Sequence, residues 1–437
     1  MNIFTRSGLA AMTAAIALSG CSYFEDDEEI LPGERIPVRA TSDDRALSPG
    51  EAARFGAVSP AQALGEWTQV GGNALHAPGH IQAPTSLSVA WRADLGAGGA
   101  LTATPVVAGG KVFGLDAAAQ VTAFSSGGAV AWRADLSPEG ESADDGFGGG
   151  LAWEAGRLFV TTGFGEVVAM DADSGEVIWR QQMTAPVRAA PAVANGIVIA
   201  VARDNTVLAF GAADGSVKWR VSGSAAGNAA LLGGASPAIS PGGVAILPFA
   251  SGELIAVRAN SGQRLWSDVL TGGRRGLARA SISDITSDPV IQGVAVIAGN
   301  QSGRLVAIDG RSGRRGWTRE FGSQSPVWAD GATLFVMSDA GELKRLSSQD
   351  GATIWSKTLP EYSDPDDRED AIAYGGPVLA GGRLLMTSSE GVLHSFDPVS
   401  GEEQASVKVA GLTGLPPVVA GGTVYVVTAN GGLVALR

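Results

Sequence analysis

A tryptophan-containing repeat occupies nearly all of the chain after residue 86. The unit reads Pro-x-Val, a Gly, a short Val-rich stretch, Gly-x-Leu/Val-x-Ala-x-Asp, a Ser/Asp-Gly turn and a Trp, as in 288–317 and 191–219. Seven tryptophans recur at intervals of 38 to 51 residues: Trp91, Trp132, Trp179, Trp219, Trp266, Trp317 and Trp355. A repeat of this length, built from short strands, is typical of one blade of a β-propeller, and the large indole ring can fill the wedge between two blades.

The repeat count predicts eight blades. Ala405 occupies the eighth equivalent place, four residues after Gly401. The last copy ends at Gly432–Leu436 without a Trp strand, whereas Ser86–Leu95 holds a Trp strand with no strands before it. Pairing these two fragments would satisfy the backbone of both and close the ring. We therefore expect an all-β fold, an eight-bladed β-propeller of four-stranded antiparallel blades closed by an N-terminal strand. A seven-bladed ring is the alternative.

Composition agrees with many short strands joined by tight turns. The 437 residues include 62 Gly, 45% are hydrophobic and only 17% are charged. The formal net charge of −13, without a long Lys/Arg block, disfavours binding to nucleic acid. The single Cys excludes an internal disulfide, so stability has to come from packing and closure of the ring.

The N-terminus is typical of an exported lipoprotein. Arg6 precedes the mostly apolar stretch Leu9–Leu18, and Leu-Ser-Gly-Cys ends at Cys21. The apolar run is too short to span a bilayer as a helix. The four-residue motif resembles the bacterial lipobox, which implies lipidation at Cys21. Ser22 follows, and lipoproteins without Asp at this place resemble those sorted to the outer membrane. An ordinary signal peptide that ends near a Cys is the alternative.

These features divide the chain into three parts. Residues 1–20 are expected to be the signal peptide, 21–65 the lipidated N-terminus and a flexible acidic tether, and 66–437 the propeller. The tether assignment rests on the acidic run Glu25–Glu29 and on scattered Pro, Gly and Ser without a sustained period.

Motifs for catalysis or metal binding are weak. None of the three histidines, His76, His80 and His394, has metal-ligand spacing, and the first two fall in a segment with Gly and Pro that favours a loop. Residues 171–175 faintly resemble a calcium loop, but they recur at 309–313 and 397–401 and so predict hairpin turns. We expect no metal, no cofactor and no catalytic residue, and an inter-blade packing role for the tryptophans.

The unit Gly-x-Leu-x-Ala-x-Asp-x-x-x-Gly-x-x-x-Trp resembles the repeat of pyrroloquinoline-quinone-type propellers. That family includes quinoprotein dehydrogenases, which use an adjacent Cys pair that this chain lacks. Lipobox, tether and eight such blades together resemble the BamB family of lipoproteins of the outer-membrane β-barrel assembly machinery. The resemblance implies a non-catalytic scaffold at the periplasmic face of the outer membrane. Its implied partners are the periplasmic domains of the barrel insertase, other assembly subunits and unfolded outer-membrane proteins.

The same resemblance implies a partner-binding site in two neighbouring loops, at about 221–236 and 268–288. The first loop matches at Leu231, Leu232, Gly233 and Ser236, with Leu232 in place of the family's Arg. The second matches at Ser283, Asp284 and Thr286, with Thr286 in place of an acid, and it also carries Arg274, Arg275 and Arg279. Independently of the resemblance, adjacent long loops on a rigid ring are where binding residues usually gather.

Three classes of function remain open at this point. The assembly scaffold is favoured; a quinoprotein dehydrogenase and a periplasmic ligand-binding propeller that uses its central funnel are the alternatives. If Asp284 is a loop charge, replacing it with Arg should weaken partner binding and leave the fold intact.

Overall fold

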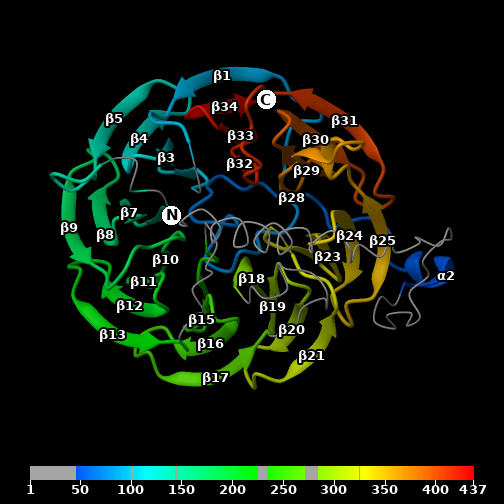
Figure 1. Cartoon of the computed structure of the whole chain (residues 1–437), viewed down its shortest axis with the longest axis horizontal. Coiled ribbons are helices and arrows are strands. Elements are labelled where there is room, and N and C mark those ends of the chain that lie inside the picture. The colour runs from blue at the N-terminus through cyan, green and yellow to red at the C-terminus, as the bar shows by residue number, and fades with distance from the viewer. Residues whose placement is uncertain are drawn as a thin grey trace, which may run out of the picture. The chain divides into compact units, whose positions relative to one another are not determined.

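The computed structural model describes residues 46–99, 103–142, 146, 148–224, 234–270, 284–323 and 325–437, all within one compact unit that spans Asp43–Arg437. Eight four-stranded antiparallel sheets are arranged around a central axis (Figure 1). The predicted eight-bladed propeller is therefore confirmed, and the seven-bladed alternative is wrong.

Each blade is a meander of four strands that runs outward from the axis. Blades 1 to 3 contain β2 (Val106–Ala108), β3 (Lys111–Leu115), β4 (Gln120–Ser125), β5 (Val130–Asp135); β6 (Gly149–Glu154), β7 (Arg157–Thr162), β8 (Glu166–Asp171), β9 (Val177–Gln182); β10 (Ala192–Ala194), β11 (Ile197–Val201), β12 (Thr206–Gly211) and β13 (Val217–Ser222). Blades 4 to 6 contain β14 (Ala238–Ile239), β15 (Val244–Pro248), β16 (Glu253–Arg258), β17 (Arg264–Val269); β18 (Ile285–Gln292), β19 (Ala295–Asn300), β20 (Leu305–Asp309), β21 (Arg315–Arg319); β22 (Trp328–Asp330), β23 (Thr333–Met337), β24 (Glu342–Ser347) and β25 (Thr353–Thr358).

Blade 7 contains β28 (Tyr374–Ala380), β29 (Arg383–Ser388), β30 (Val392–Phe396) and β31 (Glu403–Lys408). A two-stranded hairpin, β26 (Tyr362–Asp364) and β27 (Glu369–Ala371), lies between blades 6 and 7 in the chain. A four-residue helix, α2 (Pro49–Ala52), precedes the propeller. No helix among the described residues combines the length and the apolar character needed to cross a membrane.

Blade 8 is assembled from both ends of the propeller sequence. It contains β32 (Val418–Ala420), β33 (Thr423–Thr428), β34 (Gly432–Leu436) and, as its outermost strand, β1 (Val89–Asp94). Trp91 lies opposite Ala435, and the backbones of Ser88 and Arg437 exchange hydrogen bonds of 2.8 and 2.9 Å. The predicted closure of the ring is confirmed, and β1 and β34 lie side by side in Figure 1.

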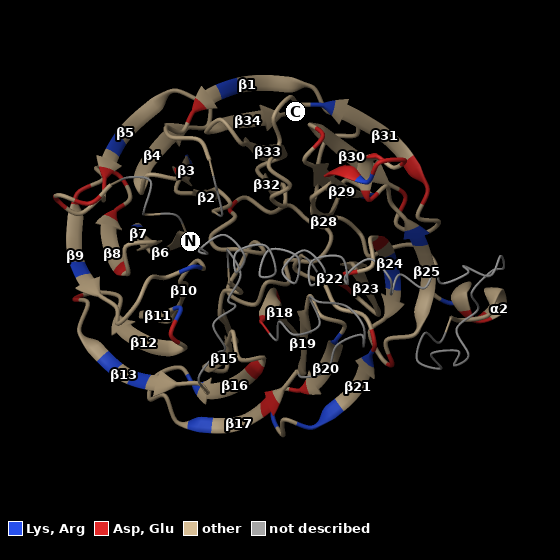
Figure 2. Cartoon of the chain, in the orientation of Figure 1, with Lys and Arg blue, Asp and Glu red and all other residues tan. Residues whose placement is uncertain are grey.

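The inner strands are buried because neighbouring blades cover both of their faces, whereas the outer strands face solvent. In β8 only the last residue is not buried, but in β9, β13 and β17 the Trp is the single buried residue. In Figure 2 the rim strands carry most of the charged bands, while the inner strands are mostly tan. The hydrophobic core is therefore a set of layers between blades, held by the apolar inner strands.

Each of the seven tryptophans packs against the next blade, as predicted. Its indole N–H donates a hydrogen bond to a carbonyl in the turn between the third and fourth strands of that blade. The pairs are Trp91–Ser126, Trp132–Ala172, Trp179–Ala212, Trp219–Ala259, Trp266–Gly310, Trp317–Ser348 and Trp355–Pro398, at 2.7 to 3.2 Å. A turn glycine lies under each ring; at Gly262 an added Cβ would approach Trp219 to 2.8 Å. Bulk is thus excluded where the indole lies.

Ala405 shows why the eighth tryptophan is absent. It lies in β31 and pairs with Ser395 of β30, at the place that Trp occupies in the other outer strands. The neighbouring blade 8 has no turn between its third and fourth strands, because β34 and β1 are the two ends of the propeller sequence. A Trp at 405 would have no turn carbonyl to bind and no turn glycine to cover.

Residues 56–83, called the brace below, run across the face of the ring where the innermost strands end. They hydrogen-bond to all eight blades, at Val107, Trp153, Val193, Ile239, Ile291, Trp328, Leu379 and Gly421. Trp67 is buried and stacks on Trp328, with ring centroids 6.1 Å apart. The brace therefore joins every blade independently of the indole contacts.

The brace corrects the expected start of the propeller. The tether was predicted to continue to residue 65, but the part from 46 onward is packed against the propeller. Leu47 donates its N–H to Thr353 at 2.9 Å, and Ser59 donates its N–H to the Asp330 carboxylate at 2.9 Å. Apart from the four-residue α2, this stretch has no periodic pattern because its residues make single contacts with successive blades.

The two brace histidines are structural. His76 Nδ1 lies 2.8 Å from the carbonyl of Pro289, while His80 Nε2 accepts the N–H of Gly382 at 2.9 Å. They bind different blades, which agrees with the predicted loop. The predicted hairpin reading of 171–175 is also confirmed: Asp171 Oδ1 accepts the N–H groups of Asp173 and Ser174 at 3.0 and 2.8 Å.

Candidate partner-binding site

Two long connections between blades carry the predicted site. They join β13 to β14 and β17 to β18, and their described ends at 223–224, 234–237, 270 and 284 lie on the face opposite the brace. Leu231, Leu232, Gly233, Ser283, Arg274, Arg275 and Arg279 lie outside the described residues, so the structure places Ser236, Asp284 and Thr286 of the predicted set. These three stand where the two connections return to the propeller.

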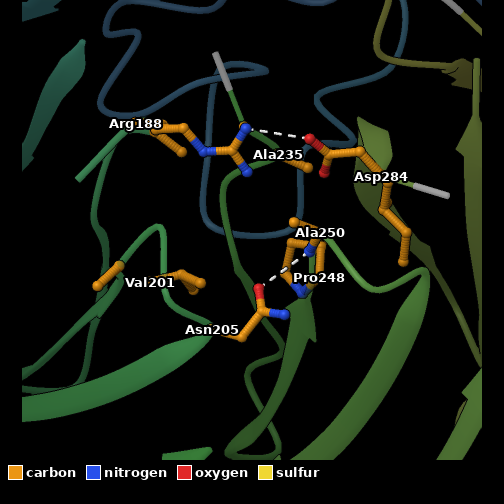
Figure 3. Close-up of a pocket in the computed structure, with 11 residues that line it drawn as sticks. Arg188, Val201, Asn205, Ala235, Pro248, Ala250 and Asp284 are labelled. Atoms are coloured by element: carbon orange, nitrogen blue, oxygen red, sulfur yellow. Dashed lines mark hydrogen bonds and ion pairs between the residues drawn. The ribbon is translucent and has the colours of Figure 1, made fainter. Parts of the chain in front are cut away.

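Asp284 forms a buried ion pair that the sequence did not predict. Its Oδ2 lies 3.0 Å from Arg188 Nη1, and the two side chains are 1% and 15% exposed (Figure 3). Arg188 precedes β10 in blade 3 and Asp284 precedes β18 in blade 5. The pair therefore bridges two blades that are not neighbours, across the return of the first connection into blade 4.

This burial corrects the expectation that Asp284 is a loop charge whose replacement leaves the fold intact. An Arg at 284 would place two guanidinium groups together in a buried site, and uncompensated buried charge is strongly destabilising. The consequence is local disruption, so a loss of binding in that variant would not identify a direct contact.

Ser236 and Asp288 form a second contact between the two connections. The Ser236 N–H donates to Asp288 Oδ1 at 2.5 Å, and both residues are buried. Burial raises the pKa of the Asp288 carboxyl to about 7, and the hydrogen bonds from Ser236 only partly offset this effect. Thr286 is half-buried and donates its hydroxyl to the Ser323 carbonyl at 3.2 Å.

Asn205 fixes the beginning of the first connection. Its Oδ1 accepts the N–H of Ala250 at 3.1 Å, as drawn in Figure 3, and its Nδ2 donates to the Ser224 carbonyl at 2.7 Å. Ser224 in turn donates its N–H to Glu253 Oε2 at 2.9 Å. Because the amide satisfies groups of blades 3 and 4 together, the base of the connection is held rigidly.

The second connection also begins at a fixed point. Leu270 donates its N–H to the Gly252 carbonyl at 2.7 Å and accepts a 2.9 Å hydrogen bond from Asn300 Nδ2. Both connections therefore leave at hydrogen-bonded residues, Ser224 and Leu270, and return at buried ones, Ser236 and Asp284. Such a rigid base suits a binding surface because little order is lost when a partner docks.

Sequence reasoning missed Arg188, Asn205 and Asp288. The only available signal for Arg188 was its place just before the innermost strand of blade 3, which puts it on the same face as the two connections. Asn205 has a positive φ of 62° at the turn between β11 and β12, a conformation for which Asn is favoured. Neither position forms part of a recognisable motif.

The residues present do not fit the calcium-bound quinone of a quinoprotein. Among the described ranges, no group of three or more His, Cys, Asp or Glu side chains could hold a metal ion. The sole Cys of the chain is Cys21, so the adjacent Cys pair expected of those dehydrogenases is missing as well.

Comparisons with known proteins show which family the chain resembles. The family model described as "Outer membrane protein assembly factor BamB" matches residues 117–357 and 363–437. The BamB of Bordetella pertussis is 26% identical over 434 residues, covering 98% of this chain and 96% of that protein. The BamB of Yersinia pestis is 25% identical over 435 residues, covering 96% and 98%.

Solved structures show the same fold. The BamB of Moraxella catarrhalis superposes with a TM-score of 0.68 at 17% identity, covering 80% of this chain and all of that one. A europium-containing methanol dehydrogenase gives a TM-score of 0.67 at 13% identity, covering 83% and 89%. The fold is thus shared by assembly factors and dehydrogenases, and the family match separates them. The chain belongs to the BamB family of outer-membrane protein assembly factors.

Proposed function

We propose that this chain is a non-catalytic lipoprotein of the outer membrane, anchored at Cys21 on the periplasmic face. It binds the periplasmic domains of the barrel insertase and so assists the insertion of outer-membrane proteins. Its binding surface is formed by the two connections at 223–237 and 270–284. The other subunits of the assembly complex are further partners.

The Arg188–Asp284 ion pair carries this proposal. It ties the return of the second connection, at Asp284, to Arg188 of blade 3. Gly234, at the return of the first connection, lines the same pocket as this pair. A bound domain then meets two loops held in one arrangement, which lowers the cost of ordering them. Family membership supplies the class of process, since the matching relatives are named as assembly factors.

Co-purification tests the partner. The chain, recovered from detergent-solubilised outer membranes, is expected to bring down the barrel insertase in amounts that mass spectrometry detects. Replacing Leu232 and Arg275 together should reduce this recovery without lowering the melting temperature. Insertase missing from the wild-type preparation would contradict the proposal.

The lipid anchor needs a separate test. Labelled palmitate should be incorporated into the wild-type chain and not into Cys21→Ala, and the variant should move from the membrane to the soluble periplasmic fraction. Equal labelling of both chains would contradict the anchor without affecting the proposed partner.

Unfolded outer-membrane proteins are a proposed second class of partner. The outer strands of blades 8, 1, 2 and 3 expose Val89, Val130, Val177 and Val217, next to a strand edge without a fifth strand. An extended polypeptide could add to such an edge by β-augmentation. Slower amide hydrogen exchange in β1, β5, β9 and β13, after addition of an unfolded barrel protein, would support this role; unchanged exchange would contradict it.

A further inference from the structure

A cavity of about 140 Å³ lies at the axis of the propeller, where the innermost strands begin. One residue from each of six blades lines it at this level, and all of them except Asp288 are uncharged: Thr104, Gly150, Ala190, Ser236, Asp288 and Pro416. Asp288 is the only ionisable member of this set. Val70 of the brace also lines the cavity, so the cavity reaches the brace on the opposite side from the two connections.

The two charged side chains at the cavity differ in their partners. Among the described residues that line it, Arg188 and Asp288 are the only charged side chains. Arg188 binds Asp284 at 3.0 Å, whereas Asp288 is 7% exposed and is bound by the N–H of Ser236. No described Lys or Arg forms an ion pair with Asp288. Asp288 is thus a carboxyl group in a desolvated region with no cation paired to it among the described residues, and an unpaired charge is costly there.

We propose that this axial cavity binds an ammonium or guanidinium group, which pairs with the carboxylate of Asp288. The small lining residues leave room for one such group, and the apolar lining would cover its alkyl stem. A metal ion is disfavoured because Ca²⁺ and Mg²⁺ take six or more oxygen ligands, whereas this cavity offers one carboxylate. The cation comes from a Lys or Arg side chain of the partner polypeptide or from a free small amine.

Binding of a cation should release a proton. Because burial raises the pKa of Asp288 to about 7, a large fraction of the folded protein carries the carboxyl in its neutral form at pH 6. Arg188 from before β10 and Ser236 from before β14 line the cavity with Asp288. The next charged or titratable groups are Asp284, which binds Arg188, and His76 of the brace, which bonds to the carbonyl of the adjacent Pro289. Burial lowers the pKa of His76 to about 4, so His76 stays neutral over this range. Affinity for the cation should therefore rise about tenfold from pH 6 to pH 8.

Calorimetric titration of the full chain tests the cavity directly. The ligands are methylguanidinium and propylammonium, and titration up to about 100 mM allows dissociation constants in the millimolar range to be measured. We expect binding that tightens from pH 6 to pH 8 and releases protons, as shown by different heats in buffers of different ionisation enthalpy. Asp288→Asn should abolish it, since the amide still accepts the Ser236 N–H but carries no charge.

Asp330→Asn is the matched control. Asp330 is buried to a similar degree, at 5% exposure, but it accepts the Ser59 N–H at the brace and does not line the cavity. This variant should titrate like the wild type. Thermal melting of both variants establishes that they are folded.

A second arm identifies the source of the cation. Capture of the insertase periplasmic domains is measured at pH 6 and pH 8 with wild type, Asp288→Asn and Asp330→Asn. This arm rests on the proposed function, whereas the titration does not. Capture that weakens only in Asp288→Asn indicates a partner side chain; amine binding without such weakening indicates a free amine. If Asp288→Asn alters neither measurement, the proposal is overturned. If wild type captures nothing, the proposed function fails and the titration alone decides.

Discussion

Arg188 and Asp284 are joined by a 3.0 Å ion pair although blade 4 separates the blades that carry them. Near the axis of a propeller the innermost strands of several blades converge, so a long side chain can reach past one blade to the next. The contact therefore couples the entry of blade 3, before β10, to the return of the second connection, before β18. Its burial, at 1% exposure for Asp284, makes it sensitive to the loss of either partner.

Arg188→Ala is expected to lower the free energy of unfolding by about 3 kcal/mol, because it leaves a buried carboxylate without this cation. Arg180→Ala is the matched control: Arg180 also lies 3.0 Å from its acid, Glu166, but is 36% exposed, and such pairs contribute roughly 1 kcal/mol or less. Urea unfolding of both variants measures the difference. Equal losses would show that burial of the Arg188 pair has no consequence.

Two substitutions at equivalent positions of different blades, Trp219→Ala and Ala405→Trp, test the indole contacts and the closure of the ring. Trp219→Ala removes a buried ring and its 2.7 Å hydrogen bond to Ala259, and should cost about 3 to 5 kcal/mol. Ala405→Trp should change the free energy of unfolding by less than about 0.5 kcal/mol, because the exposed position has no turn to cover. A clear stabilisation by Ala405→Trp would contradict the explanation given for its absence.

The repeat pattern predicted the strands and turns within each blade and the packing between neighbouring blades. The place of Trp91 opposite Ala435 followed from two incomplete copies that complete each other, and the turn role of Asp171 followed from its recurrence. The residue before each Trp position was not predicted to bulge, yet the strand pairing shifts register there in all eight blades. Alternation along a strand does not reveal a single unpaired residue.

The site was less predictable than the fold. The resemblance pointed to Asp284 as part of the binding surface, but nothing in the sequence indicated that Arg188, 96 residues away, would bury it. The brace was not predicted, for a related reason. Gln69, Ala74 and Leu75 each contact a different blade. Their spacing in the sequence therefore follows the circumference of the ring and has no helical or strand period. Contacts that depend on closure of the ring become visible only once it is closed.

The brace makes a measurable contribution through Gln69. Its buried amide donates to the Val193 carbonyl at 2.7 Å and accepts the Val193 N–H at 3.0 Å, in the manner of a paired strand. Gln69→Ala leaves two buried backbone groups unpaired, and should cost about 2 to 4 kcal/mol. Gln82→Ala, at an exposed brace position with one long contact of 3.5 Å, should cost less than about 0.5 kcal/mol. Similar costs for the two variants would argue against a stabilising brace.

Asp288 and His76 should give the stability of the chain opposite responses to pH. Between about pH 6.5 and 4 the unfolded chain protonates His76 and the folded chain does not, so this group lowers stability as the pH falls. Between about pH 4 and 7 the folded chain holds a proton on Asp288 that the unfolded chain has lost, so this group lowers stability as the pH rises.

Asp288→Asn separates the two effects, because His76 is present in both proteins and cancels in the difference. At pH 8 the wild type keeps a desolvated carboxylate that the variant lacks, so the variant should be more stable by as much as about 4 kcal/mol. Near pH 4 the wild-type carboxyl is neutral. The stability difference between the variant and the wild type should then shrink to that between two uncharged side chains. Urea unfolding at pH 4, 6 and 8 measures the trend. A difference that is constant with pH would mean that Asp288 titrates in the folded protein as it does in the unfolded chain. A difference that grows as the pH falls would mean that folding lowers the pKa of Asp288, opposite to the effect expected from its burial.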